Sequence, residues 1–144
     1  MSISTFDSPQ DAAMCDFPAK YCRVAASRVE VDDAYVLLDT GSDGHPYLYG
    51  VNCSQRDGRW LESGSSNGPG WSQAGPDDRL GTLVVWGEAP PDAEMVRLAF
   101  EGTAIEERVN NGVYLAVWWR TRCPEESWPR VEGFRIRGMW IQAA

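Results

Sequence analysis

The chain has 144 residues, a length typical of one domain, so the sequence predicts a single domain over residues 1–144. Its composition, 43% hydrophobic and 24% charged, excludes wholesale disorder because enough apolar surface is available to build a core. The net charge of −8 argues against nucleic-acid binding, which needs clustered positive charge. No apolar run approaches the roughly 20 residues that cross a bilayer, so we expect no membrane partner either.

The N-terminal segment and the cysteines indicate the compartment. The sequence MSISTFDSPQDAAM lacks the basic and apolar regions of a secretory signal, which predicts a cytoplasmic protein. The spacings of the four cysteines fit no zinc-binding motif, so we expect free thiols, no metal and no cofactor. The only histidine, His45, lies in a turn-forming sequence and is expected to be solvated rather than catalytic.

The first half of the chain predicts a short helix and several strands. Residues 1–14 are polar and aperiodic and are expected to be frayed. A short helix is expected over residues 10–20, where Pro18 would end or kink it. Apolar and β-branched runs predict strands at 21–31, 34–39, 47–53 and 59–62. The second and third of these strands are expected to form a hairpin around a Gly-containing turn.

Residues 63–81 interrupt the strand pattern because they are rich in glycine and proline. Proline lacks a ladder donor, and glycine loses much conformational entropy on ordering. We therefore expect one long loop that joins two halves of the domain. Trp71 lies in the middle of this loop, where it either pins the loop to the core or contributes to a contact surface.

The second half predicts a regular series of short strands. They are expected at residues 82–86, 95–101, 104–109, 113–120 and 131–141, with Gly138 as a bulge or turn. Asn111-Gly112 is typical of a tight hairpin turn, because both positions tolerate positive φ. About nine or ten strands without crossover helices indicate an all-β fold, an antiparallel β-sandwich.

The strand at 113–120 has apolar side chains on both faces, whereas a sandwich strand normally has one wet face. Tyr114 and Trp118 share one face and need cover, because burying an aromatic side chain is worth roughly 1.5–3 kcal/mol. That cover comes from the rest of the chain, from a second copy or from a ligand.

Several segments resemble uncharacterised bacterial proteins with an immunoglobulin-like β-sandwich. The resemblance is carried by residues 96–102 with 111–119, and by the shorter motifs at 47–50, 67–71 and 128–131. It spans residues 20–141, implies an immunoglobulin-like sandwich and implies no known activity. Twelve of the 13 basic residues are arginine, which suggests a high-GC bacterial source.

A second, local resemblance concerns the sequence Leu38-Asp39-Thr40-Gly41-Ser42, which is similar to the active-site signature of aspartic proteases. In that family two such aspartates share a proton and activate a water. With one copy per chain, the resemblance implies the retroviral type, a dimer in which Asp39 is catalytic and Thr40 and Gly41 hold it in place. The segment nearest to the family's later glycine motif, 85–87, contains a bulky tryptophan, which departs from the pattern.

The residues together favour a non-enzymatic recognition or scaffold domain that binds a protein or small ligand through aromatic side chains. The expected partner is a protein or a second copy of the chain. The candidate contact residues are Asn67, Gly70, Trp71, Tyr114, Trp118 and Arg120. The dimeric aspartic hydrolase is the alternative. A paired-carboxylate enzyme is less favoured, because neighbours such as Glu106-Glu107 and Glu125-Glu126 point to opposite faces of a strand.

Overall fold

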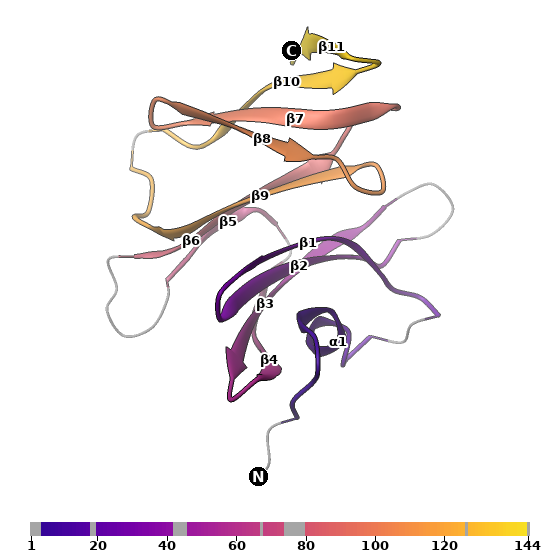
Figure 1. Cartoon of the computed structure of the whole chain (residues 1–144), viewed down its shortest axis with the longest axis vertical. Coiled ribbons are helices and arrows are strands. Elements are labelled where there is room, and N and C mark those ends of the chain that lie inside the picture. Colours follow the sequence, from indigo (N-terminus) through magenta and orange to yellow (C-terminus); the bar gives the residue numbers. More distant parts are fainter. Residues whose placement is uncertain are drawn as a thin grey trace. The chain divides into compact units, whose positions relative to one another are not determined.

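A computed structural model describes residues 4–17, 20–41, 46–66, 68–73, 80–125 and 127–143. These residues form one short helix and eleven strands, and every strand pairing is antiparallel, which confirms the all-β class (Figure 1). In the described part of the chain, no helix has the length and apolar character needed to cross a membrane. The chain divides into two compact units, Met1–Pro69 and Gly70–Ala144.

The first unit is a four-stranded meander with a short helix packed on one face. Its strands follow the chain in the order β1-β2-β3-β4. The turn between β3 and β4 is Asp57-Gly58, in which both residues have positive φ, as a two-residue hairpin requires. The elements are α1 (Pro9–Ala13), β1 (Arg23–Glu30), β2 (Asp33–Asp39), β3 (Leu48–Arg56) and β4 (Arg59–Ser66).

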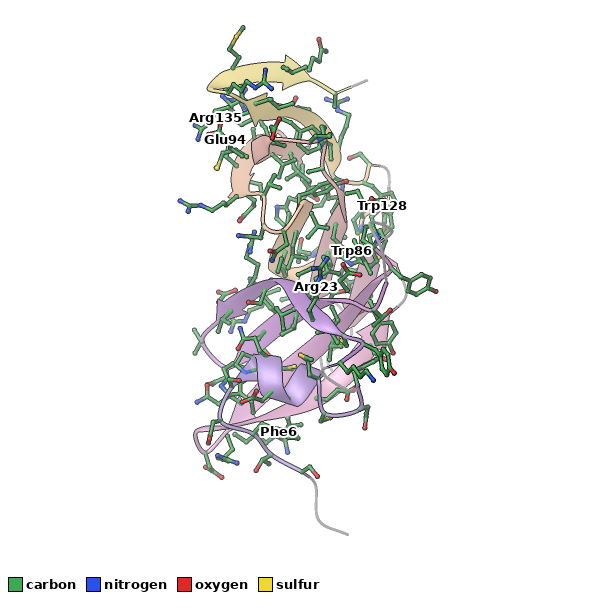
Figure 2. All side chains as sticks on the ribbon, turned by 90° about the vertical axis from the view of Figure 1, so that its right-hand side faces the viewer. Phe6, Arg23, Trp86, Glu94, Trp128 and Arg135 are labelled. Atoms are coloured by element: carbon green, nitrogen blue, oxygen red, sulfur yellow. The ribbon has the colours of Figure 1, made fainter. Side chains whose placement is uncertain are left out.

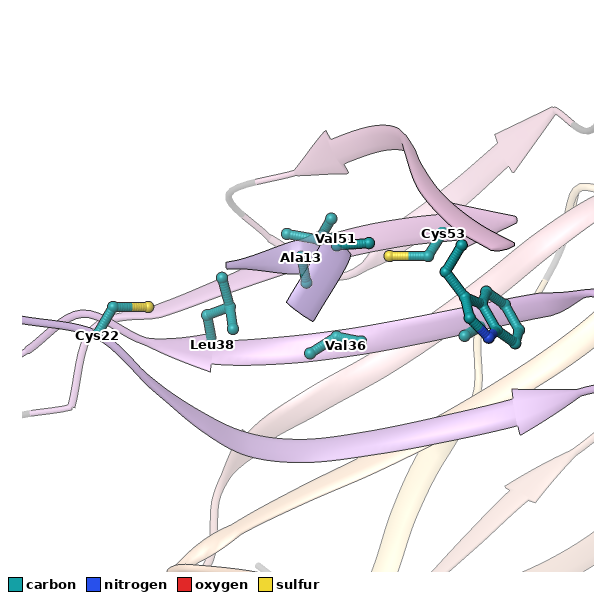
Figure 3. Packing of buried hydrophobic residues seen from close by; sticks show 9 residues of the cluster. Ala13, Cys22, Val36, Leu38, Val51 and Cys53 are labelled. Carbon is teal, nitrogen blue, oxygen red and sulfur yellow. The ribbon is translucent and has the colours of Figure 1, made fainter. Parts of the chain in front are cut away.

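The core of the first unit lies between α1 and the meander. Alternate residues of β2 and β3 point toward the helix, because side chains on a strand repeat every two positions. Ala13 of α1 packs over Val36, Leu38 and Val51, all fully buried (Figure 3). The alternation expected for residues 47–53 holds for Tyr49, Val51 and Cys53, whereas Tyr47 is exposed.

The N-terminal segment is more ordered than expected. The prediction that residues 1–14 are frayed is wrong for residues 4–14, although residues 1–3 lie outside the described part. Phe6 and Trp60 exchange backbone hydrogen bonds of 2.8 Å in each direction. The helix begins earlier than expected because the Ser8 side chain accepts a hydrogen bond from the Asp11 N–H, at 3.1 Å, and caps it. Pro9 occupies the first helical position, where a backbone N–H has no partner within the helix, so its missing N–H costs nothing.

The second unit contains two sheets, ordered β11-β10-β7-β8 and β5-β6-β9. Val96 and Leu98 of β7 pack with Ala116 of β9, so the two sheets enclose one core and form a sandwich. The strands are β5 (Gly70–Gln73), β6 (Gly81–Glu88), β7 (Ala93–Phe100), β8 (Thr103–Arg108), β9 (Val113–Thr121), β10 (Arg130–Ile136) and β11 (Met139–Gln142).

The segment 63–81, expected to be one long loop, is partly strand. Residues 63–66 complete β4 and residues 70–73 form β5, while Asn67 and residues 74–79 lie outside the described part. Both strands are at sheet edges, where glycine is tolerated because only one side of the strand needs to be paired. Pro69 falls between the two strands, so no ladder hydrogen bond is lost to it.

Two turns of the second unit have positive φ at two consecutive residues. Asn111-Gly112 forms the expected tight turn, and Asn110 and Val113 exchange hydrogen bonds of 2.9 Å across it. The flanking strands then separate, because β8 pairs with β7 whereas β9 pairs with β6 in the other sheet. Residues 131–141 were expected to have a bulge or a turn at Gly138. They contain β10 and β11, joined by an Arg137-Gly138 turn with positive φ at both positions, which confirms the turn.

Candidate functional site

Two of the predicted contact residues, Tyr114 and Trp118, point into the sandwich core. The Tyr114 ring packs against Phe134 with centroids 5.8 Å apart, and the Trp118 ring packs edge-on to Phe100 at 5.5 Å. Burial raises the pKa of the Tyr114 hydroxyl. The chain itself therefore covers part of each aromatic side chain, and both are half-buried against the core.

Trp71 also has a role inside its own unit. Its indole N–H donates a hydrogen bond to the backbone oxygen of Thr121, at 2.9 Å, and its ring lies against Gly81. Gly70 pairs with Val84 on the same pair of strands, and Arg120 is an exposed residue of β9. The structure therefore brings Trp71 to the end of β9, a position close in sequence to Arg120, whereas Asn67 lies outside the described residues.

Asp39 is a buried carboxylate, 5% exposed, at the end of β2. Its Oδ1 accepts hydrogen bonds from the backbone N–H groups of Gly41, at 2.9 Å, and Tyr47, at 3.1 Å. Its Oδ2 accepts from the Arg23 guanidinium, with Nη2 at 3.0 Å. Both carboxylate oxygens are thus engaged by groups that favour the charged form.

The electrostatics of Asp39 follow from these contacts. Burial alone raises the pKa, but the hydrogen bonds from Gly41, Arg23 and Tyr47, with the Arg23 charge, outweigh it and hold the pKa below its ordinary value. The Thr40 N–H donates to Tyr47 O at 2.9 Å. The Asp-Thr-Gly sequence therefore closes the base of a loop, which favours a structural role over an acid poised on water.

A mixed group of possible metal ligands lies where the chain leaves α1. The ligand atoms of Cys15, Asp16 and Glu62 are all within 4.8 Å of one another. Burial, then the charges of Asp16 and Glu62, raise the pKa of the Cys15 thiol. A thiol and two carboxylates are donors that Zn²⁺ accepts. Acidic side chains often gather at protein surfaces without an ion, so no metal site is assigned to this group.

The four cysteines are free and differ in burial. Burial, then the charges of Glu62 and Cys15, raise the pKa of Cys53 to about 12. We expect an alkylating reagent at mildly alkaline pH to label Cys53 at least about 1,000-fold more slowly than a thiol of ordinary pKa. Exposed Cys123 should be labelled first, as mass spectrometry can show. The urea-unfolded chain, the control, should label at all four positions; fast labelling of Cys53 in the folded chain would contradict the burial.

The surface that sequence reasoning missed is β11. All four of its residues are exposed, and three are large hydrophobics: Met139 is 71% exposed, Ile141 51% and Trp140 36%. None of the four is charged. Exposed apolar side chains on an edge strand are a feature that natural proteins usually block with charge or proline.

The two faces of β11 differ. Ile141 pairs with Phe134, so Met139 and Ile141 continue the core-facing side of the sheet. Trp140 lies on the opposite side, where the Arg97 guanidinium stacks on its ring, 4.1 Å from Cζ to the centroid. Arg97 also forms an ion pair of 2.7 Å with Glu106. This stack holds the Trp140 side chain in place, so the side chain would lose less rotamer entropy on binding a partner.

Among the described residues, no strand pairs with the side of the β11 backbone that faces away from β10. The Ala143 N–H donates to Glu132 O at 2.9 Å, so residue 143 turns its backbone toward β10. Antiparallel pairs alternate, so Ile141 and Met139 do the same, whereas Trp140 and Gln142 turn their N–H and C=O groups outward. Figure 1 shows β11 beside β10 only, at the edge of its sheet.

The charges around this edge are balanced. Arg135 of β10 forms an ion pair with Glu94 at 3.6 Å (Figure 2), and Arg137 in the turn pairs with Asp92 at 3.5 Å. The edge is therefore apolar in its side chains and close to neutral in its surroundings, although the whole chain is acidic.

Fold and site together define an all-β sandwich protein with an open, uncharged strand edge. Comparison with models of known families, with curated proteins and with solved structures found no match to this chain. The sequence signal that could have located the edge is the run Met-Trp-Ile-Gln after Arg137-Gly138, which lacks any charged residue.

Proposed function

We propose that the protein is a non-enzymatic recognition module that binds an extended segment of a protein chain alongside β11. The observation that carries this proposal is the edge itself: exposed Met139, Trp140 and Ile141 beside outward-facing backbone groups at Trp140 and Gln142. A strand added there gains main-chain hydrogen bonds, and its alternate side chains contact Met139 and Ile141. The matching segment has apolar residues two positions apart.

The alternative, a dimeric hydrolase using Asp39, has less support. Its carboxylate is held by Gly41, Tyr47 and Arg23, and a catalytic dyad instead needs an oxygen available to water. A paired-carboxylate enzyme is also less favoured, because Glu106 is ion-paired with Arg97.

The immunoglobulin-like arrangement is part of this proposal, for the second unit. Numbered from β5, the strands of one sheet are the first, second and fifth, and those of the other are the seventh, sixth, third and fourth. Constant-type immunoglobulin sandwiches likewise place the first, second and fifth strands in one sheet and the third, sixth and seventh in the other. Their fourth strand joins the first of these sheets, whereas β8 lies in the second sheet here. This order supports the assignment. The four free thiols support a reducing, cytoplasmic location.

Hydrogen exchange with a panel of extended peptides tests strand addition. Peptides with alternating apolar residues should slow exchange of the Trp140 and Gln142 amides, because these amides face outward in the free chain. The same peptides with a central proline should not slow this exchange, because proline has no backbone N–H to donate to the neighbouring strand. If no peptide slows exchange at these two amides while the fold is intact, the proposal fails.

A charge variant gives the matched control. Ile141→Lys places a cation on the binding edge, and it should weaken peptide binding by about tenfold or more, because a charge buried without a partner costs more than about 1.4 kcal/mol. Ala104→Lys adds the same charge to an exposed position on β8, the other edge of the sheet. Peptide binding to that variant should be unchanged. Equal losses in both variants would contradict the assignment to β11.

A further inference from the structure

We infer that the segment that pairs with β11 is β11 of a second copy of this chain. The inference rests on the proposed strand addition and goes further, because it names the partner and the register. Its basis is that the edge is self-complementary in its backbone, its side chains and its charge. A closed two-fold contact needs such a surface, in which the same patch serves both copies.

The outward backbone groups fix the register. Only Trp140 and Gln142 of β11 turn their N–H and C=O groups away from β10. All of these groups find partners when Trp140 of one copy lies opposite Gln142 of the other, and the reverse. The two-fold axis then passes beside Ile141, which lies opposite Ile141 of the second copy. A register centred on Trp140 would place Gln142 opposite Gly138, whose N–H already donates to Glu94 at 3.1 Å.

The side chains agree with this register. On the core-facing side, two Ile141 side chains meet at the axis, in a non-hydrogen-bonded pair with Cα atoms about 4.5 Å apart. Met139 flanks each of them, so the most exposed apolar side chains lose water together. On the other side, each Trp140, already held by Arg97, packs beside Gln142 of the second copy.

Charge favours a second copy despite the net charge of −8 on each chain. The paired strands carry no charge, and the nearest arginines, Arg135 and Arg137, have their own acidic partners. Other edge strands, such as β1 and β8, contain charged residues. Edge strand β5 is uncharged, but the ring and indole N–H of Trp71 are used within its own unit.

The contact is small. Two strands of four residues bury less than the roughly 1,200 Å² of a stable interface, so we expect a reversible dimer seen only at high micromolar concentration. Sedimentation equilibrium over a concentration series should show this dimer. Ile141→Lys should weaken association by about 100-fold, because two like charges, one from each copy, meet at the axis and are removed from water there. Ala104→Lys should dimerise as the unmodified chain does.

A complementary pair keeps the test valid if a variant is less stable. Ile141→Lys and Ile141→Glu should each remain monomeric alone and associate when mixed, because opposite charges then face each other across the axis. Circular dichroism checks that both variants are folded. Failure of the mixture to associate, with both variants folded, would overturn the register.

Cross-linking tests the axis directly, in a background with Cys15 and Cys123 replaced by serine. Ile141→Cys should form an intermolecular disulfide under mild oxidation, because the expected Cα separation of about 4.5 Å lies within disulfide range. Met139→Cys is the control: it is more exposed, but four residues of offset place its two copies roughly 14 Å apart. Equal cross-linking at both positions would indicate random collision and overturn the inference.

The two proposals fail in different ways. If the chain stays monomeric at every concentration but foreign peptides still slow exchange at Trp140 and Gln142, strand addition stands and the second copy is excluded as partner. If neither concentration nor any peptide affects these amides, both proposals are excluded.

Discussion

Replacing Asp39 with alanine is expected to lower the free energy of unfolding by about 2–3 kcal/mol. The substitution removes the acceptor for the N–H groups of Gly41 and Tyr47, which lie at 2.9 Å and 3.1 Å from Oδ1. It also leaves the Arg23 guanidinium without its carboxylate. Urea denaturation followed by circular dichroism measures the loss.

Two variants separate the contributions to this effect. Arg23→Ala should lower the free energy of unfolding by only about 0.5–1 kcal/mol, because the Arg23 side chain is 73% exposed and its ion pair is screened by water. Asp39→Asn keeps an acceptor oxygen but loses the charge, so its effect should be intermediate. If Arg23→Ala is as destabilising as Asp39→Ala, the backbone hydrogen bonds do not have the role assigned to them.

The pH dependence of stability has a defined sign. The pKa of Asp39 is lower in the folded chain than in the unfolded chain, so the folded state favours the carboxylate. The resulting stability is fully present at neutral pH and is lost as the pH falls through the lowered pKa. The difference in unfolding free energy between the unmodified chain and Asp39→Asn should therefore shrink on acidification. A difference that grows toward acid pH would contradict the direction of the shift.

Gly81→Ala is expected to lower the free energy of unfolding by about 2–3 kcal/mol, because the added methyl group overpacks the β5–β6 contact. A Cβ at Gly81 would lie 2.1 Å from the backbone oxygen of Ser72 and 2.7 Å from the Trp71 ring. Backbone has little freedom to move away, so β5 should separate from β6. Faster amide exchange in Gly70–Gln73, with a lower denaturation midpoint, would show this separation.

Gly70→Ala on the same pair of strands is the control. In the part of the chain that the structure describes, no atom lies within 4 Å of a Cβ at Gly70, and the residue is in a strand, so alanine should be neutral or slightly stabilising. Equal destabilisation by the two substitutions would mean that glycine is needed for its backbone freedom and not for the close approach at Gly81.

Much of the fold could be predicted from residue patterns. The period-two alternation of Val96, Leu98 and Phe100 identified a buried face, because alternation reports directly on burial. Turns such as Asp57-Gly58 and Asn111-Gly112 were recognisable because few sequences tolerate positive φ at two consecutive positions. Which strands pair after a turn depends on long-range packing, so the separation of β8 from β9 was not predictable locally.

The candidate site was harder to predict because exposure depends on neighbours that are distant in sequence. Tyr114 and Trp118 have a pattern that suits either a core or a surface, and the positions of Phe134 and Phe100 decide between them. Met139 and Ile141 read as ordinary core residues of a closing strand. They are exposed because β11 lies at the sheet edge, a property of strand order.

The parting of β8 and β9 after their shared turn has a kinetic consequence. The strand that precedes β9 in the sequence, β8, is not its pairing partner. The Asn111-Gly112 turn therefore does not lead directly to a β8–β9 hairpin. Leu115 must instead find Trp86, and Val117 must find Val84, across roughly thirty intervening residues. The chain loses the entropy of closing that loop before the pairing of β6 with β9 can stabilise it. Formation of this sheet should therefore limit the rate at which the second unit folds.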